Sequence, residues 1–195
     1  MKINIKRMKI TLLGIAFLVF TSCSKTTENT TNASGVSNDL HLSFVTPDWN
    51  RTINCDQLNL FPIYLNDSTN YVSATSASTL ETFCFSLPAD SSQMVKTTNL
   101  KKYNIRNFFE NNSPFEFSQK LPLISGSNLR LISMDSISSL SFNEVTEINY
   151  IGFEANYCLF KVKCKYEMLA KELNNETNIK PITGSFHFKV RTSRR

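Results

Sequence analysis

The feature that most constrains the fold is a strict alternation of residue types over residues 157–168. Every second position is apolar, and the positions between them are mostly charged: Cys158, Phe160, Val162, Cys164, Tyr166 and Met168 alternate with Leu159, Lys161, Lys163, Lys165 and Glu167. Successive side chains of a β-strand point to opposite faces, whereas a helical pattern repeats every 3.6 residues. The alternation therefore predicts a strand with one face in the core and the other in water.

The segments on either side continue this pattern. Residues 144–153 and 184–191 predict two further strands, joined to the first by a turn at 154–156 and a polar loop at 171–178. Together they predict a three-stranded antiparallel meander with one wet face. In the last strand Phe186, Phe188 and Val190 are expected to face inward, and His187, Lys189 and Arg191 to face outward.

Shorter strands are predicted through the rest of the domain. Residues 40–45, 115–121 and 129–134 read as strands, and residues 71–77 and 82–87 as a hairpin, while residues 91–112 fit a helix or a strand equally well. Many short strands with fifteen Phe and one Trp are typical of two all-β architectures. We expect a single domain over residues 39–195, either an antiparallel β-sandwich or a flattened lipocalin-like barrel.

The first 23 residues have the order of an export signal. Lys2, Lys6, Arg7 and Lys9 precede an uncharged, mostly apolar run over residues 10–20, which is followed by Thr21-Ser22-Cys23. Such a run is shorter than the roughly 20 residues of a membrane-spanning helix. We therefore interpret it as a cleaved signal.

Phe20-Thr21-Ser22-Cys23 resembles the lipobox of bacterial lipoproteins, in the looser form of the Bacteroidota type, although Phe stands where Leu is usual. The ending at residues 184–190 also looks like the last strand of small uncharacterised lipoproteins of that type. The resemblance implies a signal peptide over residues 1–22, acylation of Cys23 with palmitate-like chains, and a membrane-anchored lipoprotein of the cell envelope. We favour the outer membrane over the inner.

Residues 24–38 lack aromatic side chains and are rich in Ser, Thr and Asn, so they cannot bury enough apolar surface to fold. Residues 23–38 are thus expected to be the lipidated cysteine and a flexible tether. Removal of residues 1–22, with four basic and no acidic side chains, lowers the net charge from +5 to +1. That charge gives no reason to expect a nucleic acid partner.

The four remaining cysteines leave two alternatives. Cys158 and Cys164 lie six positions apart on one predicted strand, about 20 Å along its length, and so cannot form a disulfide. Cys55 and Cys84 are the candidate disulfide in an oxidising compartment. The alternative is four buried thiols that behave as small apolar residues.

Catalytic and metal-binding patterns are missing from the sequence. The only two histidines, His41 and His187, stand at expected exposed positions with no acid fixed near them, and the domain's glycines are isolated. No Gly-x-Ser-x-Gly turn or Cys/His cluster is present. We expect no cofactor and no metal, and an enzyme is the least favoured class.

Aromatic residues near turns are the remaining indication of function. Trp49, Tyr64 and Tyr71 are candidate binding residues, and Tyr103 also lies near a turn. Aromatic rings stack on sugars and are enriched at binding surfaces, although a lone Trp often plugs the core. The sequence favours a non-enzymatic binding or structural module for an envelope protein or glycan. The alternative is a lipocalin-like carrier of an apolar molecule.

Overall fold

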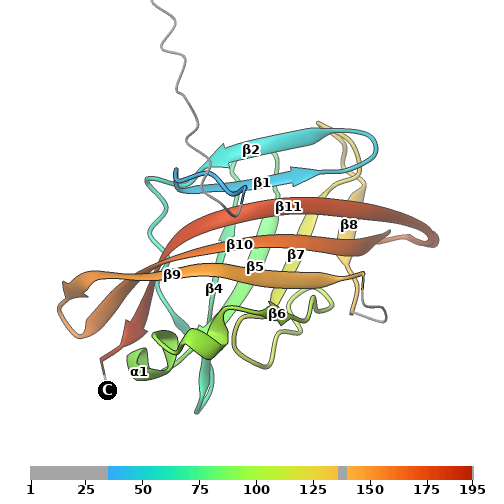
Figure 1. Cartoon of the computed structure of the whole chain (residues 1–195). Helices are drawn as coiled ribbons and strands as arrows, with labels where there is room; N and C mark the ends of the chain where they lie inside the picture. The colour runs from blue at the N-terminus through green and yellow to red at the C-terminus, as the bar shows by residue number, and fades with distance from the viewer. Residues whose placement is uncertain (1–34, 136–139, 195) are drawn as a thin grey trace, which may run out of the picture.

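The computed structural model describes residues 35–135 and 140–194. Cys23, the signal and residues 24–34 of the predicted tether lie outside this part of the chain. The described residues form one antiparallel sheet of eleven strands, which bends into two layers that cross each other (Figure 1). The prediction of an all-β single domain is confirmed, and the architecture is sandwich-like.

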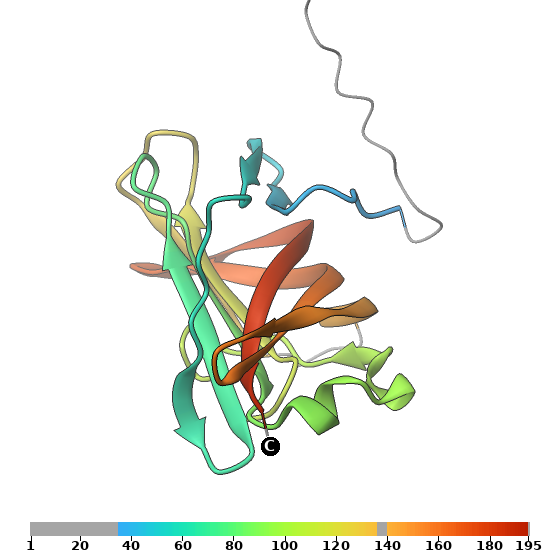
Figure 2. The same cartoon turned by 90° about the vertical axis from the view of Figure 1, so that its left-hand side faces the viewer.

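The two layers are easily told apart when viewed from the side (Figure 2). In spatial order, the front layer contains β6 (Lys102–Tyr103), β9 (Phe142–Glu154), β10 (Tyr157–Glu172), β11 (Asn175–Ser193), β1 (His41–Val45) and β2 (Asn50–Asn54). The back layer contains β8 (Arg130–Ser133), β7 (Phe117–Pro122), β5 (Thr82–Pro88), β4 (Thr69–Thr75) and β3 (Ile63–Asn66).

Strand β10 joins the layers. Its residues 157–167 pair with β9 and its residues 170–172 pair with β8, so the sheet turns a corner along one strand. The path of paired strands ends at β2 on one side and at β3 on the other. The sheet is therefore open and does not close as a lipocalin barrel does.

The predicted meander is present as β9–β10–β11. Val162 pairs with Phe188 on one side and with Ile148 on the other, and Cys164, Phe186 and Phe188 are buried. The prediction of a polar loop over residues 171–178 is wrong, because β10 runs to Glu172 and β11 already begins at Asn175. Polar side chains do not prevent ladder pairing where a long hairpin extends into solvent.

Phenylalanine rings fill the space between the layers. Phe186 and Phe188 of β11 stack with ring centroids 4.5 Å apart, and Phe188 stacks at the same distance on Phe83 of β5. Phe117 of β7 lies 5.0 Å from Phe186, and Phe85 of β5 lies 5.1 Å from it. These contacts join the front layer to the back layer directly.

Gly184 is required by the close approach of Tyr166. A Cβ at Gly184 would overlap both the Ser43 carbonyl oxygen and the Tyr166 ring. The buried Tyr166 hydroxyl donates to the Ser43 carbonyl at 3.0 Å and lies 2.9 Å from Oε1 of Gln119 on β7. The ring therefore passes over the glycine and adds a polar link between the layers.

Three outward positions of the front layer are buried, contrary to the expectation from alternation. His41, His187 and Lys163 are 4%, 3% and 4% exposed. The reason is that residues 36–39 lie across this face: Val36 is buried, and the Asn38 carbonyl accepts from Nδ1 of His187 at 2.9 Å. The end of the predicted tether thus packs on the domain.

Arg191, also expected to face water, is buried as well. It is 5% exposed because its guanidinium lies 4.4 Å from the Phe61 ring centroid and donates to Asn59, both from the segment between β2 and β3. Its Nη2 also lies 2.9 Å from Glu154 Oε2.

The ambiguous segment 91–112 contains little regular structure. It holds the one-turn helix α1 (Ser91–Met94), a 3-10 turn over Thr97–Asn99 and the two residues of β6. Within residues 35–135 and 140–194, no helix is long and apolar enough to cross a bilayer.

We predict that Phe186→Ala lowers the free energy of unfolding by about 3–5 kcal/mol, because it leaves a cavity among stacked rings. The matched control is Phe153→Ala on the β9–β10 hairpin, where the ring is 66% exposed and the loss should stay below about 1 kcal/mol. Urea denaturation of both variants measures the difference. Equal losses would contradict this description of the core.

Candidate functional site

A groove of about 680 Å³ opens at one end of the sandwich, beside α1. Its walls come from the β3–β4 turn, the segment that follows β5, and the residues before β7. The residues that line it include Asp67, Asp90, Gln93, Lys96, Asn99, Lys101, Tyr103 and Phe115. The volume falls within the roughly 300–1,000 Å³ that is usual for small-ligand sites.

Tyr103 and Phe115 give the groove an aromatic floor. Their ring centroids are 5.0 Å apart, and Phe115 is buried while Tyr103 is half-buried. The Tyr103 hydroxyl donates to the Asn99 carbonyl at 3.2 Å, which fixes the ring. Burial raises the pKa of Tyr103 to about 12, so the hydroxyl stays protonated at neutral pH.

The wall formed by α1 is held by short-range contacts. The Asp90 carboxylate caps the helix by accepting from the Ser92 backbone N–H at 2.8 Å, and Met94 is buried in the core. The Asn99 amide donates to the carbonyls of Gln93 and Met94, at 2.7 and 3.1 Å. A segment with almost no regular structure is thereby given a fixed shape.

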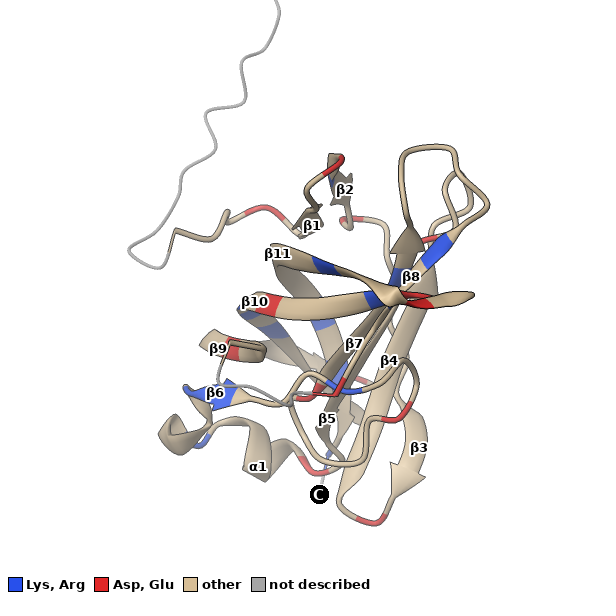
Figure 3. Ribbon diagram, turned by 90° about the vertical axis from the view of Figure 1, so that its right-hand side faces the viewer, with Lys and Arg blue, Asp and Glu red and all other residues tan. Residues whose placement is uncertain are grey.

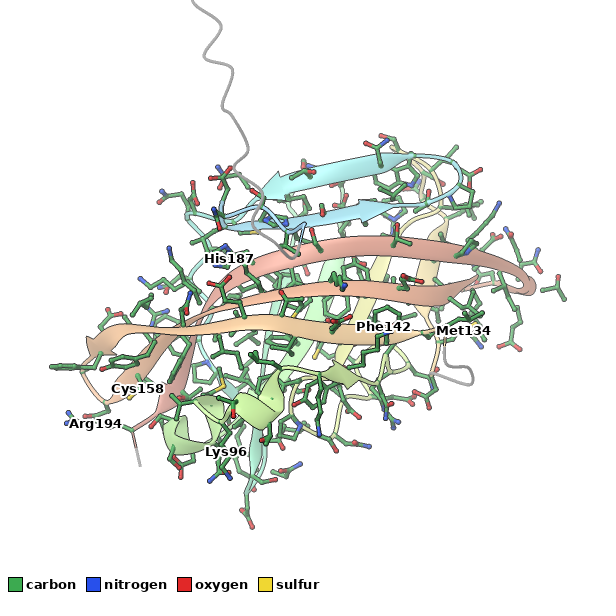
Figure 4. All side chains as sticks on the ribbon, in the orientation of Figure 1. Lys96, Met134, Phe142, Cys158, His187 and Arg194 are labelled. Carbon is green, nitrogen blue, oxygen red and sulfur yellow. The ribbon has the colours of Figure 1, made fainter. Side chains whose placement is uncertain are left out.

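The polar groups of the groove have mixed charge. Lys101 Nζ lies 5.3 Å from the centroid of the Tyr103 ring, and Lys96 stands on the wall formed by the α1 segment (Figure 4). Asp67 and Asp90 supply carboxylates, and Gln93 supplies an amide. Donors and acceptors beside one flat apolar ring suit a neutral polyhydroxy ligand better than an apolar one.

The three aromatic residues singled out from the sequence do not come together. Trp49 packs edge-on against Phe44, with ring centroids 4.8 Å apart, and its Nε1 donates to the Pro122 carbonyl at 3.2 Å. The Trp49 ring therefore covers one end of the core. Tyr71 packs against Phe109 at 6.1 Å. The structure gives both rings packing partners.

Tyr64 is 69% exposed and lies beside the groove without lining it. Its hydroxyl donates to the Asp67 carboxylate at 3.1 Å, and this bond raises the pKa of Tyr64. Tyr64 instead lines a neighbouring hollow of about 260 Å³, and Asp67 belongs to both. Tyr103 is thus the aromatic residue at the centre of the site.

Cys55 and Cys84 are free thiols, so the disulfide considered from the sequence is not formed. Cys55 packs in the core beside Phe83, whereas Cys84 follows Phe83 on β5 and therefore points to the other face of the back layer. Burial raises the pKa of Cys55 to about 11 and that of Cys84 to about 12. Both thiols remain protonated at neutral pH.

His41 forms a polar network on the front layer. Its Nδ1 lies 2.8 Å from the Asp39 carbonyl and its Nε2 lies 2.9 Å from Ser185 Oγ. A hydrolase usually has a carboxylate where this carbonyl stands. The Ser185 N–H already donates to Ser43 Oγ, at 3.3 Å, and so cannot bind an oxyanion. We interpret the network as a structural link between β1 and β11.

The part of the chain that the structure describes contains no cluster of three or more His, Cys, Asp and Glu that could hold a metal ion. Comparisons with protein families, with curated proteins and with solved structures found no match.

We predict that His187 makes the protein less stable at mildly acidic pH. Burial, and next the Lys163 ammonium, lower the pKa of His187 from 6.5 to about 4. The unfolded chain binds a proton near pH 6.5 and the folded chain only near pH 4, so the free energy of unfolding falls as the pH drops through this window. Above pH 6.5 this contribution to stability is fully present.

His187→Asn keeps a donor for the Asn38 carbonyl and removes the titration, so the variant should lose less stability than the wild type between about pH 6.5 and pH 4. Carboxylates that titrate in the same range are common to both proteins. Urea denaturation over a pH series measures the difference, and superimposable profiles would contradict the prediction.

Proposed function

We propose that the protein is a lipid-anchored module of the cell envelope that binds an envelope glycan or protein in the groove at the end of its sandwich. The observation that carries the proposal is the fixed aromatic floor of Tyr103 and Phe115 beneath mixed polar groups. The anchor rests on the resemblance of residues 20–23 to a lipobox. We place the protein at the outer membrane.

The chemistry of the groove favours a glycan over a protein partner. A sugar presents an apolar ring face together with hydroxyl groups, and the groove offers one half-buried ring with a surround of carboxylate, amide and ammonium groups. A protein-binding surface usually has several large aromatic or apolar anchors at its centre. Of the two aromatic residues that line the groove, Tyr103 is accessible to a partner and Phe115 is buried.

The alternative of a lipocalin-like carrier has less support. The interior is occupied by stacked Phe rings whose centroids are 4.5 Å apart. The apolar pocket beside Cys55 and Phe83 has a volume of about 80 Å³. That is well below the volume of a usual ligand site. An enzyme has still less support, since His41 meets the Asp39 carbonyl where a carboxylate is usual and the Ser185 N–H is already bonded to Ser43.

We predict that Tyr103→Ala weakens glycan binding at least tenfold, or about 1.4 kcal/mol, because the stacking surface is lost. The probes are soluble peptidoglycan fragments and lipopolysaccharide core oligosaccharides, measured by calorimetry. Tyr103→Phe keeps the ring and should bind within about threefold of the wild type. Tyr150→Ala, which removes a 54% exposed ring from β9, is the control.

Equal affinity of the Tyr103→Ala and Tyr150→Ala variants would reject the groove as the site. Failure of the wild type to bind any of these probes would reject a glycan ligand and favour a protein partner. Thermal unfolding of each variant shows whether a loss of binding is only a loss of fold.

We predict that the protein purified from membranes carries acyl chains on Cys23, since two or more chains are needed for stable attachment. Intact mass measurement should show cleavage before Cys23 and the added mass of the acyl groups. Cys23→Ser should abolish both, so that the variant keeps residues 1–22 and carries no acyl mass. An unmodified mature mass for the wild type would contradict the anchor.

A further inference from the structure

The chain enters the domain on the outer face of the front layer. Lys163 Nζ donates to the Asn38 side-chain oxygen at 2.7 Å, and His187 donates to the Asn38 carbonyl at 2.9 Å. Val36 is only 2% exposed. Residues 36–38 are therefore fixed to β10 and β11 at the upper side of the molecule (Figure 1).

In the part of the chain that the structure describes, two lysines without a carboxylate partner lie beside the contacts of Asn38 with Lys163 and His187. Lys161 of β10 and Lys189 of β11 are direct partners in the ladder, and Asn149, the partner of Lys161 on β9, is neutral. Among the described residues, neither ammonium has a carboxylate within 4.0 Å, whereas Lys163 pairs with Glu147 and Lys165 with Glu144. The charged residues of the front layer are shown in Figure 3.

Like charges directly opposite on adjacent strands destabilise a sheet. Their effect is also visible at the neighbouring histidine, because Lys161 contributes to the lowered pKa of His187. An anion that bridges the two ammonium groups would relieve this repulsion. Phosphate groups of lipid headgroups are the anions nearest to a domain that is held at a bilayer.

We propose that the outer face of the front layer, centred on Lys161 and Lys189, is the surface by which the domain rests on an anionic lipid bilayer. The proposal depends on the lipid anchor proposed above. Cys23 stands twelve positions before Gly35, and twelve residues of any chain reach at most about 40 Å. The bilayer surface is thus within reach of the face on which residues 36–38 are docked.

The groove lies away from the docked segment. Helix α1 lies at the lower side of the molecule in both views, and the docked segment lies at the upper side (Figures 1 and 2). His187 and Lys96 are correspondingly far apart in Figure 4. The groove beside α1 therefore lies at the other end of the molecule from the docked segment.

The test is lysine acylation of the lipidated protein in vesicles of phosphatidylethanolamine and phosphatidylglycerol, compared with the same protein in non-ionic detergent. Lys161 and Lys189 should react at least about threefold more slowly in the vesicles, and high salt should reduce this protection. Lys96 and Lys120, near α1 and on β7, are internal controls and should react equally in both. Equal rates at all four lysines would overturn the proposal.

A second measurement separates this surface from the lipid anchor. Residues 23–195 with Cys23→Ser, which lack both the basic signal and the acylated cysteine, should sediment with phosphatidylglycerol vesicles and not with phosphatidylcholine vesicles. Lys161→Glu with Lys189→Glu should weaken this binding at least about tenfold, whereas Lys96→Glu with Lys120→Glu, an equal change in charge, should weaken it much less. Binding that is absent, or lowered equally by both pairs, would overturn the proposal even if Cys23 is acylated.

Discussion

The stack of Phe83, Phe188, Phe186 and Phe117 is the contact on which the rest of the structure depends. Two of these rings come from the front layer and two from the back layer. Burial of large apolar surfaces is the main favourable contribution to folding, and aromatic pairs in this geometry add to it. The sheet is open, and among the strands of the described residues only β10 pairs with strands of both layers, so the layers depend on this stack to stay together.

The crossing of the layers also creates the site. Strands that cross at an angle diverge at the ends of the sandwich, and one end is filled by short irregular segments. Trp49 covers one end through Phe44 and Pro122, while α1, anchored by Met94, forms a wall at the other. The groove over Tyr103 is thus what remains where the second end is only partly filled. A binding surface arises there without any opening of the core.

The sequence predicted well where neighbouring residues decide the structure. The alternation around Phe160 and Val162 was enough to predict strand β10, and the alternation around Phe186 and Phe188 was enough to predict strand β11. It failed where a distant backbone group decides the environment. His187 is buried because the Asn38 carbonyl meets its ring across 149 positions, and no local pattern contains that information.

The candidate site shows the same limit. Tyr103 is recognisable as an aromatic residue near a turn, but its neighbours Asp67 and Phe115 come from segments far away in the chain. Trp49 has the stronger sequence signal for binding, yet its hydrogen bond to Pro122 places it in a packing role. Whether Cys55 and Cys84 can form a disulfide likewise depends on which face of the back layer each lies against, and both are free thiols.

The most direct test of the groove is a backbone amide NMR titration of the mature chain, residues 23–195, with a soluble peptidoglycan fragment. If the fragment binds in the groove, shift changes should concentrate at residues 67–68, 88–103 and 113–115, which surround Tyr103. Shift changes centred instead on the stacked rings of the interior would support a carrier. Shift changes centred on Trp49, or none at saturating fragment, would contradict binding in the groove.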